Sequence, residues 1–325
     1  MRFTTLIRPS VLTACLAAAA AVLPGPAAAN STDVDLPTYR PKSNVSGQVS
    51  LMGSTTMTEV AQIWMDTFRQ YNPNVRDTLE VRGSRGAVDA VIDGEATFGL
   101  LSRSITQGEV DKFQSRFGYQ PQVLTCCLEH MAIYVHESNP IRKISLEQIR
   151  DVFSGKAKTW GDLGVTGQWA PQPIVTHGRG DKTGSRVFLE QSVLRGTEHR
   201  VRVEHRNNRD LVTAIGGDEV RGIGYAGLIY KLPGVKAVPV AASEGQSAVA
   251  IDSLAAARGQ YPLMRPLQLV VNHKPGTTLD PAAAEFLKYV FSRSGQSDVI
   301  RGGFQPISAR PARIALDTIG LGTAR

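Results

Sequence analysis

Three short loops of the chain combine hydroxyl side chains, glycines and basic groups, which proteins use to bind oxyanions. They are residues 53–56 (Gly-Ser-Thr-Thr), 82–86 (Arg-Gly-Ser-Arg-Gly) and 179–185 (Arg-Gly-Asp-Lys-Thr-Gly-Ser). Each precedes an expected helix, and a helix start leaves backbone N–H groups unpaired and carries a partial positive charge. Each loop also has an ordinary interpretation, as a helix cap or as a solvent-exposed turn.

The loop at residues 179–185 is the most informative of the three. It joins the guanidinium of Arg179, which can bind an oxyanion through two donors, to two hydroxyls and a glycine ahead of a helix. The loop at residues 82–86 does not match the eight-residue phosphate loop of nucleotide hydrolases, so a nucleotide is not indicated. Three turns of one chemistry can act on a single ligand if the fold brings them to one cleft.

The elements that must position these loops follow the pattern of an α/β protein. Short apolar, β-branched runs alternate with amphipathic stretches almost throughout. Strands are expected at Val49–Met52, Leu79–Arg82 and Thr97–Leu101, and helices at Thr58–Tyr71 and Gly86–Asp93. Two of the polar loops therefore lie between a strand and a helix.

Two strongly apolar strands far apart in the sequence, Met131–His136 and Leu267–Asn272, predict a chain that leaves its first lobe and later returns. We expect lobe one to comprise residues 49–132 and 267–325, and lobe two residues 133–266. Removing an export signal of 29 residues from 325 would leave 296, a length that favours two lobes over one core. The remaining expected helices are Ser145–Phe153, Arg186–Leu194 and Pro281–Ser292.

The first 29 residues are expected to be a cleaved signal peptide. Arg2 and Arg8 precede an apolar stretch at residues 11–23, and three alanines place the cleavage after Ala29. The apolar stretch is too short to span a bilayer. A lipid anchor on Cys15 is the alternative, because residues 12–15 fit a lipoprotein cleavage box. Residues 30–48 are expected to form a flexible lead-in to a periplasmic or secreted protein.

The net charge of +7 indicates either a generally basic surface or a field that collects small anions. Basic residues are spread along the chain without a basic run or an aromatic ladder, which argues against nucleic acid as a partner. After export only Cys126 and Cys127 remain. We expect buried free thiols at a strand edge, with a strained vicinal disulfide as the alternative, and no metal site, because partners at the required spacing are missing.

An exported phosphatase is the competing class of function, and the sequence offers it no catalytic residues. A hydrolase needs a nucleophile with a base, or metal ligands at characteristic spacing. The sequence has no Gly-x-Ser-x-Gly motif, and its six histidines form no metal-binding motif. The sequence of residues 222–227 fits the Gly-x-Gly-x-x-Gly pattern of dinucleotide-binding proteins. Pro233 follows too soon for the helix that this motif requires, so we expect a tight strand instead.

In these loops the chain resembles the phosphate-specific periplasmic binding proteins of ATP-driven (ABC) transporters, which have the type II solute-binding fold. The resemblance covers nearly the whole mature chain. Beyond the three loops, it rests on short motifs at residues 98–103, 139–140, 149–164, 222–225, 261–263, 295–296 and 303–304. It implies an α/β fold of two lobes with a hinge of two crossing strands.

By position, the resemblance implies an anion site shared by the two lobes. Lobe one would bind through Ser54, Thr55, Thr56 and Ser84, and lobe two through Arg179, Thr183, Gly184 and Ser185. Ser102 stands where some members carry an aspartate that accepts the proton of hydrogen phosphate, which leaves sulfate or molybdate as alternative ligands. Arg103 is either a second charge near the ligand or a salt-bridge residue, and Asp181 either supplies a carboxylate to the ligand, faces solvent or pairs with Lys182.

The implied function is high-affinity binding of inorganic phosphate outside the cytoplasm and its delivery to an inner-membrane ABC permease by closure of the lobes. The resemblance implies a monomer without cofactor and without enzyme activity. A phosphate sensor or adhesin that takes no part in transport is the alternative, since the signal peptide fits it equally well.

Overall fold

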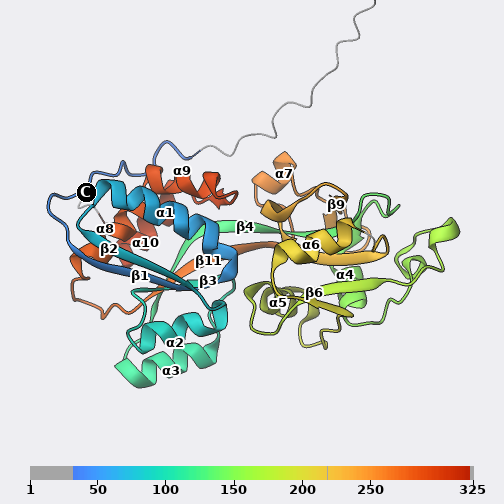
Figure 1. The fold of residues 1–325 in the computed structure, drawn as a ribbon, viewed down its shortest axis with the longest axis horizontal. Coiled ribbons are helices and arrows are strands. Elements are labelled where there is room, and N and C mark those ends of the chain that lie inside the picture. The colour runs from blue at the N-terminus through green and yellow to red at the C-terminus, as the bar shows by residue number, and fades with distance from the viewer. Residues whose placement is uncertain (1–31, 218, 323–325) are drawn as a thin grey trace, which may run out of the picture.

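The computed structural model describes residues 32–217 and 219–322. These residues form two α/β lobes that lie side by side, with two long strands running between them (Figure 1). A single path of hydrogen-bonded strands passes through both lobes. The expected arrangement of two lobes and a hinge of crossing strands is confirmed.

Lobe one is built on three parallel strands, β1 (Gly47–Gly53), β2 (Val75–Val81) and β3 (Phe98–Leu101), with β1 in the middle. β1 and β3 are buried along most of their length, as is typical of parallel strands covered on both faces. The register aligns Gly53 with Val81 on one side and with Leu100 on the other. The three strands therefore end at one edge of the sheet, where two of the polar loops begin.

Helices cover both faces of this sheet (Figure 1). On one face lie α1 (Thr58–Tyr71), α8 (Pro281–Val290), α9 (Arg293–Arg301) and α10 (Ala309–Thr318), and on the other α2 (Ala87–Ile92) and α3 (Gln107–Phe117). The helix predicted at Thr58–Tyr71 is confirmed at both ends. Its Trp64 and Phe68 are buried in the lobe-one core, and Phe68 lies edge-on to Phe286 of α8.

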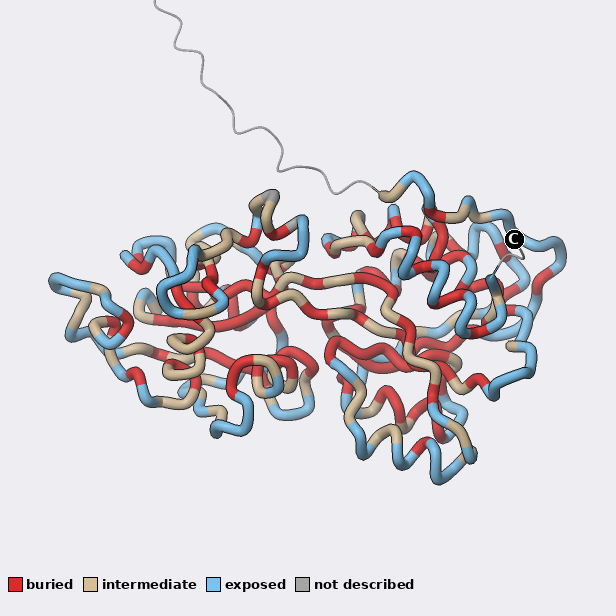
Figure 2. Tube along the Cα trace, turned by 180° about the vertical axis from the view of Figure 1, so that it is seen from behind, coloured by how far each residue is buried: buried red, intermediate tan, exposed pale blue. Residues whose placement is uncertain are grey.

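The strands that connect the lobes are β4 (Gln122–His136) and β11 (Met264–Val271). They are antiparallel, and their register pairs Arg265 with Glu129. The second half of β4 continues into lobe two, and Figure 2 shows buried residues along the strands of both lobes and of the crossing. Both strands begin earlier than the sequence predicts, at Gln122 instead of Met131 and at Met264 instead of Leu267.

Lobe two continues the sheet with β8 (Gly222–Gly227), β6 (Val175–Arg179) and β7 (Val203–His205), in that order from β4. β8 is buried throughout and confirms the tight strand expected there. The helices of lobe two are α4 (Leu146–Phe153), α5 (Gly184–Leu189) and α6 (Asn208–Gly216). Ser145 caps α4 in a capping box, whereas α5 is followed by a π-helical turn at Glu190–Leu194.

The shorter elements complete both lobes. They are β5 (Ile144–Ser145), β9 (Val235–Ala237), β10 (Val240–Ala241), β12 (Gln305–Pro306) and α7 (Leu254–Ala257). β9 and β12 both pair with β4, so this strand has partners from lobe one and from lobe two.

The described part of the expected lead-in, residues 32–46, lies along lobe one. Leu36 is buried in the core of that lobe, and the Asp33 carboxylate accepts the Ala309 N–H at 2.9 Å. The Tyr39 hydroxyl accepts a hydrogen bond of 2.8 Å from the Asn72 side chain. The expected signal peptide and Cys15 lie outside the described residues. Within residues 32–217 and 219–322, no helix is long and apolar enough to cross a membrane.

Cys126 and Cys127 lie side by side on β4, and both are buried free thiols, as the sequence predicts. The Cys126 thiol donates to the Leu267 carbonyl at 3.2 Å. Burial raises the pKa of the Cys127 thiol well above its ordinary value. Cys127 therefore stays protonated and acts as a small apolar side chain of the core.

Candidate functional site

Three serines of lobe one, Ser54, Ser84 and Ser102, meet where β1, β2 and β3 end. Ser54 Oγ donates to Ser102 Oγ at 2.8 Å, and Ser84 Oγ lies 3.2 Å from the same oxygen. The Ser102 N–H also donates to Ser84 Oγ at 3.2 Å. All three side chains are buried. The sheet thus brings together hydroxyls that are distant in the sequence, and we call this group the serine cluster.

The backbone at Gly53 ties the first two loops to each other. Its carbonyl accepts the N–H groups of Arg82 at 3.1 Å and of Gly83 at 2.8 Å. Its φ of 140° favours glycine, and a Cβ there would lie 2.5 Å from the Leu100 carbonyl oxygen. Beyond it, Ser54 Oγ accepts the Thr56 N–H at 3.1 Å, and the half-buried Thr55 lies in the same turn.

Arg103 contacts the loop of Ser84. Its partners decide between the two roles that the sequence left open, a charge near the ligand or a salt-bridge residue. Its guanidinium donates to both carboxylate oxygens of Glu109, at 2.6 and 2.8 Å, and to the Ser84 carbonyl at 3.1 Å. Glu109 also belongs to the capping box of α3, with Thr106 as the cap. Arg103 is therefore a salt-bridge residue that fixes the position of the Ser84 loop.

Arg179, at the end of β6, is a buried cation of lobe two. Its exposed fraction is 1%, and its guanidinium donates to the Asn208 side-chain oxygen and, at 2.9 Å, to the Arg206 carbonyl. Its buried Nε has no hydrogen-bond partner among the described residues. Burial lowers the pKa of Arg179, since it disfavours the charged form. Across the described chain no carboxylate forms an ion pair with it, and its protein partners are neutral oxygens.

The third loop lies against lobe one through Gly184. A Cβ at this position would lie 2.1 Å from Ser102 Oγ and 2.8 Å from Ser84 Oγ, so only glycine allows the approach. The Thr183 hydroxyl donates to the Gly180 carbonyl at 2.8 Å and closes its own turn. The serine cluster and the third loop are therefore in contact where the two lobes meet.

Arg85 and Asp181 meet across the two lobes. Arg85 Nη2 donates to the Asp181 carbonyl at 2.9 Å, and its Nη1 lies 3.6 Å from the Asp181 carboxylate. Both side chains are more than half exposed. Asp181 thus pairs with an arginine of the opposite lobe instead of the neighbouring Lys182.

A third buried arginine, which the sequence did not indicate as a site residue, lies on β11. Arg265 Nε donates to Glu129 Oε2 at 2.6 Å, and its Nη1 donates to the Ser102 carbonyl at 2.8 Å. Its Nη2 donates to Ser185 Oγ at 3.0 Å and to Thr56 Oγ1 at 3.3 Å. Burial raises the pKa of the Glu129 carboxyl, and the charge of Arg265 opposes that shift.

The three buried arginines differ in how their charge is compensated. Arg103 pairs with Glu109 and Arg265 pairs with Glu129, each through short contacts to a carboxylate. Arg179 has only neutral hydrogen-bond partners. Apart from burial, the nearby charge of Arg265 lowers the pKa of Arg179, whereas that of Asp210, which forms no ion pair with it among the described residues, raises it. The site as a whole carries an excess of positive charge in a region that is shielded from water, which is an arrangement suited to an anion.

Three residues of this site, Glu129, Asn208 and Arg265, were missed by sequence reasoning. Glu129 is the one acidic residue of β4, a strand that is mostly apolar, and this is a signal that could have singled it out. Arg265 lies beside Pro266 in the stretch that precedes the predicted return strand. Asn208 begins α6, which the sequence analysis did not predict. Only the pairing of β4 with β11 shows that Glu129 and Arg265 meet.

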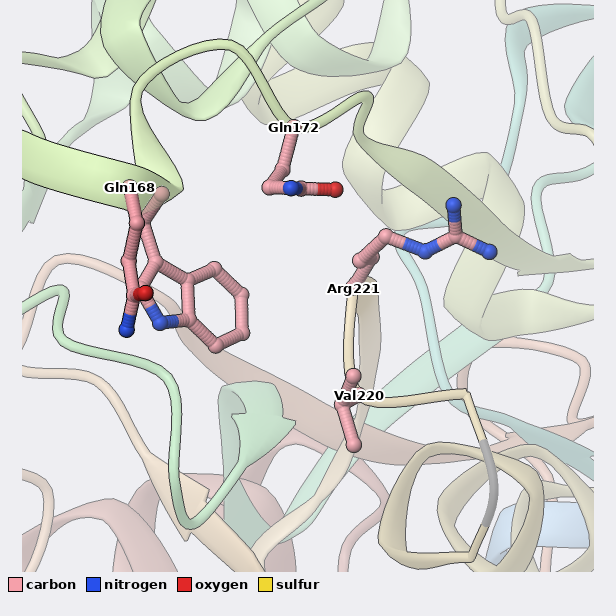
Figure 3. A pocket seen from close by; sticks show the side chains of 5 residues that line it. Gln168, Gln172, Val220 and Arg221 are labelled. Carbon is pink, nitrogen blue, oxygen red and sulfur yellow. The ribbon is translucent and has the colours of Figure 1, made fainter.

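A cavity of ≈ 470 Å³ lies elsewhere in lobe two and is lined by Gln168, Trp169, Gln172, Val220 and Arg221 (Figure 3). Val220 and Arg221 precede β8, whereas Gly227, at the other end of this strand, lies beside Glu129. Six residues of strand separate the two ends by about 20 Å. This cavity is therefore distinct from the cleft, and none of the predicted site residues lines it.

Comparisons with known proteins cover most of the chain. Residues 38–294 match the family model of the PBP superfamily domain. The phosphate-binding protein PstS of Pseudomonas aeruginosa is 34% identical over 318 residues, which are 95% of this chain and 98% of the relative. The structure of an ABC-type phosphate transport receptor from Vibrio cholerae is 19% identical with a TM-score of 0.64, and the match covers 79% of this chain and 98% of the other.

Proposed function

We propose that this chain, which belongs to the PstS-like phosphate-binding proteins of the PBP superfamily, captures inorganic phosphate between its lobes and delivers it to an ABC permease. The family membership supports phosphate as the ligand, and the observation that carries the proposal is the state of Arg179. A buried guanidinium without a carboxylate is unfavourable unless an anion compensates it. An oxyanion held between Arg179 and the serine cluster would supply that compensation.

The site that we propose is shared by the lobes and needs neither metal nor cofactor. Lobe one, at residues 49–132 and 267–325, would donate hydroxyl and N–H hydrogen bonds, and lobe two, at residues 133–266, would supply the charge of Arg179 and the end of the third loop. The contact between Gly184 and the serine cluster supports this arrangement, because it brings both sets of donors together. The proposed ligands are Ser54, Thr55, Thr56, Ser84, Ser102, Arg179, Thr183, Gly184 and Ser185.

We propose phosphate as the ligand, rather than sulfate or molybdate, because the curated relatives are named phosphate-binding proteins. Ser102, which stands in place of an aspartate, provides a hydroxyl and no negative charge. Binding without turnover is expected, because the polar groups of the cleft are donors and paired charges rather than an activated nucleophile.

Calorimetric titration of the mature protein, stripped of bound anion, tests the proposal. Phosphate and arsenate, which both carry a proton near neutral pH, should bind tightly, while sulfate and molybdate should give little heat. Tight binding of sulfate or molybdate together with weak binding of phosphate would overturn the assignment of the ligand. Release of free phosphate from a phosphomonoester would overturn the claim that the protein only binds.

Export and the partner complete the proposal. The predicted signal peptide, with cleavage after Ala29, would place a monomeric protein outside the cytoplasmic membrane, where its closed form meets a permease of the inner membrane. Pull-down of a phosphate permease by the closed, phosphate-loaded protein and not by the stripped protein would support delivery. Capture of a permease by neither form would argue for the sensor or adhesin interpretation.

A further inference from the structure

Arg265 is the one buried arginine of the described residues whose side chain contacts both lobes. It lies on the hinge strand β11, next to Glu129 on the hinge strand β4. Toward lobe one it donates to the Ser102 carbonyl and to Thr56 Oγ1. Toward lobe two it donates to Ser185 Oγ, and its guanidinium carbon lies 5.5 Å from the centre of the Phe188 ring. Ser185 and Phe188 are three residues apart on α5, so they present one face to Arg265.

The direction of these hydrogen bonds decides what the two hydroxyls can do. A hydroxyl has one proton to donate and two lone pairs to accept with. Because Arg265 Nη2 donates to Thr56 Oγ1 and to Ser185 Oγ, each oxygen uses a lone pair on the guanidinium and keeps its own proton free. Two hydroxyls from opposite lobes are thereby set as donors, which is the state that an anion requires.

The contacts also depend on the position of the lobes. The Ser102 carbonyl and Thr56 belong to lobe one and would stay with β11 when the cleft opens. Ser185 and Phe188 belong to lobe two and would leave Arg265. Glu129 holds the guanidinium in place from the hinge through Oε2, at 2.6 Å from Nε and 2.5 Å from Nη2. Opening therefore exchanges the lobe-two contacts of a fully buried guanidinium for solvent.

We infer that Arg265, oriented by Glu129, is a positioning residue that couples closure of the lobes to the donor state of Thr56 and Ser185. This inference rests on the proposed function and adds to it a reason why phosphate stays bound. The guanidinium acts through the two hydroxyls and through its contacts with lobe two. Its loss should therefore chiefly increase the rate at which the closed, phosphate-bound protein opens. The expected signature is a faster release of phosphate with a nearly unchanged rate of capture.

The test is stopped-flow measurement of phosphate association and dissociation for the double variant Arg265→Gln/Glu129→Gln, which removes both charges and leaves no unpaired buried ion. We expect the dissociation rate to rise about ten- to a hundredfold, the range for loss of hydrogen bonds from a charged group, and the association rate to change less than about threefold. The matched control is Arg69→Gln/Asp77→Asn. That pair, with contacts of 2.8 and 3.0 Å, lies wholly in lobe one, about 16 Å along α1 from Thr58.

The outcomes separate this inference from the proposed function. If the wild-type protein does not bind phosphate, the proposed function falls and the inference falls with it. If the wild type binds and the double variant releases phosphate no faster than the control, the inference alone is wrong. The inference would also be wrong if the association rate fell as much as the dissociation rate was expected to rise. Such a result would indicate a structural defect that lowers the fraction of binding-competent protein, with no effect on the lifetime of the complex.

A second variant covers the case in which the double variant does not fold. Arg265→Lys keeps the positive charge beside Glu129 but replaces the planar fork by a single ammonium, which cannot reach Glu129, Thr56 and Ser185 in the same geometry. We expect dissociation to be faster by about tenfold with an unchanged melting temperature of the phosphate-free protein. A phosphate dissociation rate equal to that of the wild type would show that only the charge at position 265 matters, and would overturn the proposed coupling.

Discussion

The two halves of the cleft hold their polar groups in different ways. In lobe one, Ser102 hydrogen-bonds to Ser54 and Ser84, and Arg103, paired with Glu109, anchors the backbone of Ser84. In lobe two, Arg179 is buried with neutral partners only. Hydroxyls that satisfy each other tolerate the absence of a ligand, whereas a lone buried cation does not. On the proposed function, the demand for negative charge therefore lies in lobe two and the directional fit to the anion in lobe one.

The largest effect is expected from Arg179→Gln, which removes the charge of lobe two. Truncating one partner of a desolvated charged contact weakens binding by about 2–5 kcal/mol, so phosphate affinity should fall roughly 30- to 4,000-fold. The phosphate-free protein should keep its melting temperature, because the removed charge has no carboxylate partner among the described residues. Calorimetry and thermal melts with and without phosphate measure both. Phosphate-induced stabilisation equal to that of the wild type would remove Arg179 from the site.

A strong effect is also expected from Gly184→Ala, which separates the halves of the cleft without touching a charge. The added Cβ would lie 2.1 Å from Ser102 Oγ, and overpacking of this kind opposes closure by about 1–3 kcal/mol, or roughly 5- to 150-fold in affinity. Small-angle scattering with saturating phosphate should show a larger radius of gyration than for the wild type.

Gly108→Ala is the control for this change, because a Cβ at Gly108 of α3 would have nothing within 4 Å. It should leave both the affinity and the radius unchanged. If Gly184→Ala closes as fully as this control, the contact between Gly184 and the serine cluster does not describe the bound form.

A smaller effect is expected from Ser84→Ala, which removes one hydroxyl of the serine cluster. A single neutral hydrogen bond contributes about 0.5–1.5 kcal/mol, so affinity should fall roughly two- to tenfold. Ser54 and Ser102 would keep their 2.8 Å contact. Titration calorimetry measures the loss. A decrease as large as that of Arg179→Gln would mean that lobe one supplies more than directional fit.

The smallest effect is expected from Asp181→Ala, which removes the carboxylate opposite Arg85. Exposed ion pairs contribute about 0–1 kcal/mol and are screened by salt, so dissociation of phosphate should be faster by less than about fivefold at low salt and unchanged at high salt. The Asp181 carbonyl would still accept from Arg85. A salt-independent loss of affinity would instead place the Asp181 carboxylate on the ligand.

The sequence supports prediction of the loops better than prediction of the hinge, for a physical reason. Hydroxyls and glycines at strand ends carry a local signal, which singled out the loops of Ser54 and Ser84, whereas Ser102 was indicated only by the family resemblance. Arg265 and Glu129 meet only through the register of β4 and β11. Pro266 also makes that register hard to predict. Because proline lacks the N–H that a strand residue donates, the sequence favours a strand that starts after it.

The role of Arg103 was undetermined for a related reason. Its partner Glu109 lies in the first turn of α3, a helix that the sequence analysis did not predict. Without that helix, a charged residue next to Ser102 could equally face a ligand. The fold class, the crossing strands and the helix at Thr58–Tyr71 were predicted, because long apolar periodic segments depend little on distant partners.

The uncompensated guanidinium of lobe two also bears on how the protein behaves in a test tube. If the proposed site is right, the closed protein should retain whichever fitting oxyanion the growth medium or buffer supplies, and dialysis should remove that anion only as fast as the lobes open. Native mass spectrometry of freshly purified protein should therefore show an adduct with the mass of an oxyanion. Unfolding and refolding in anion-free buffer, more than extended washing, is the route to an empty sample.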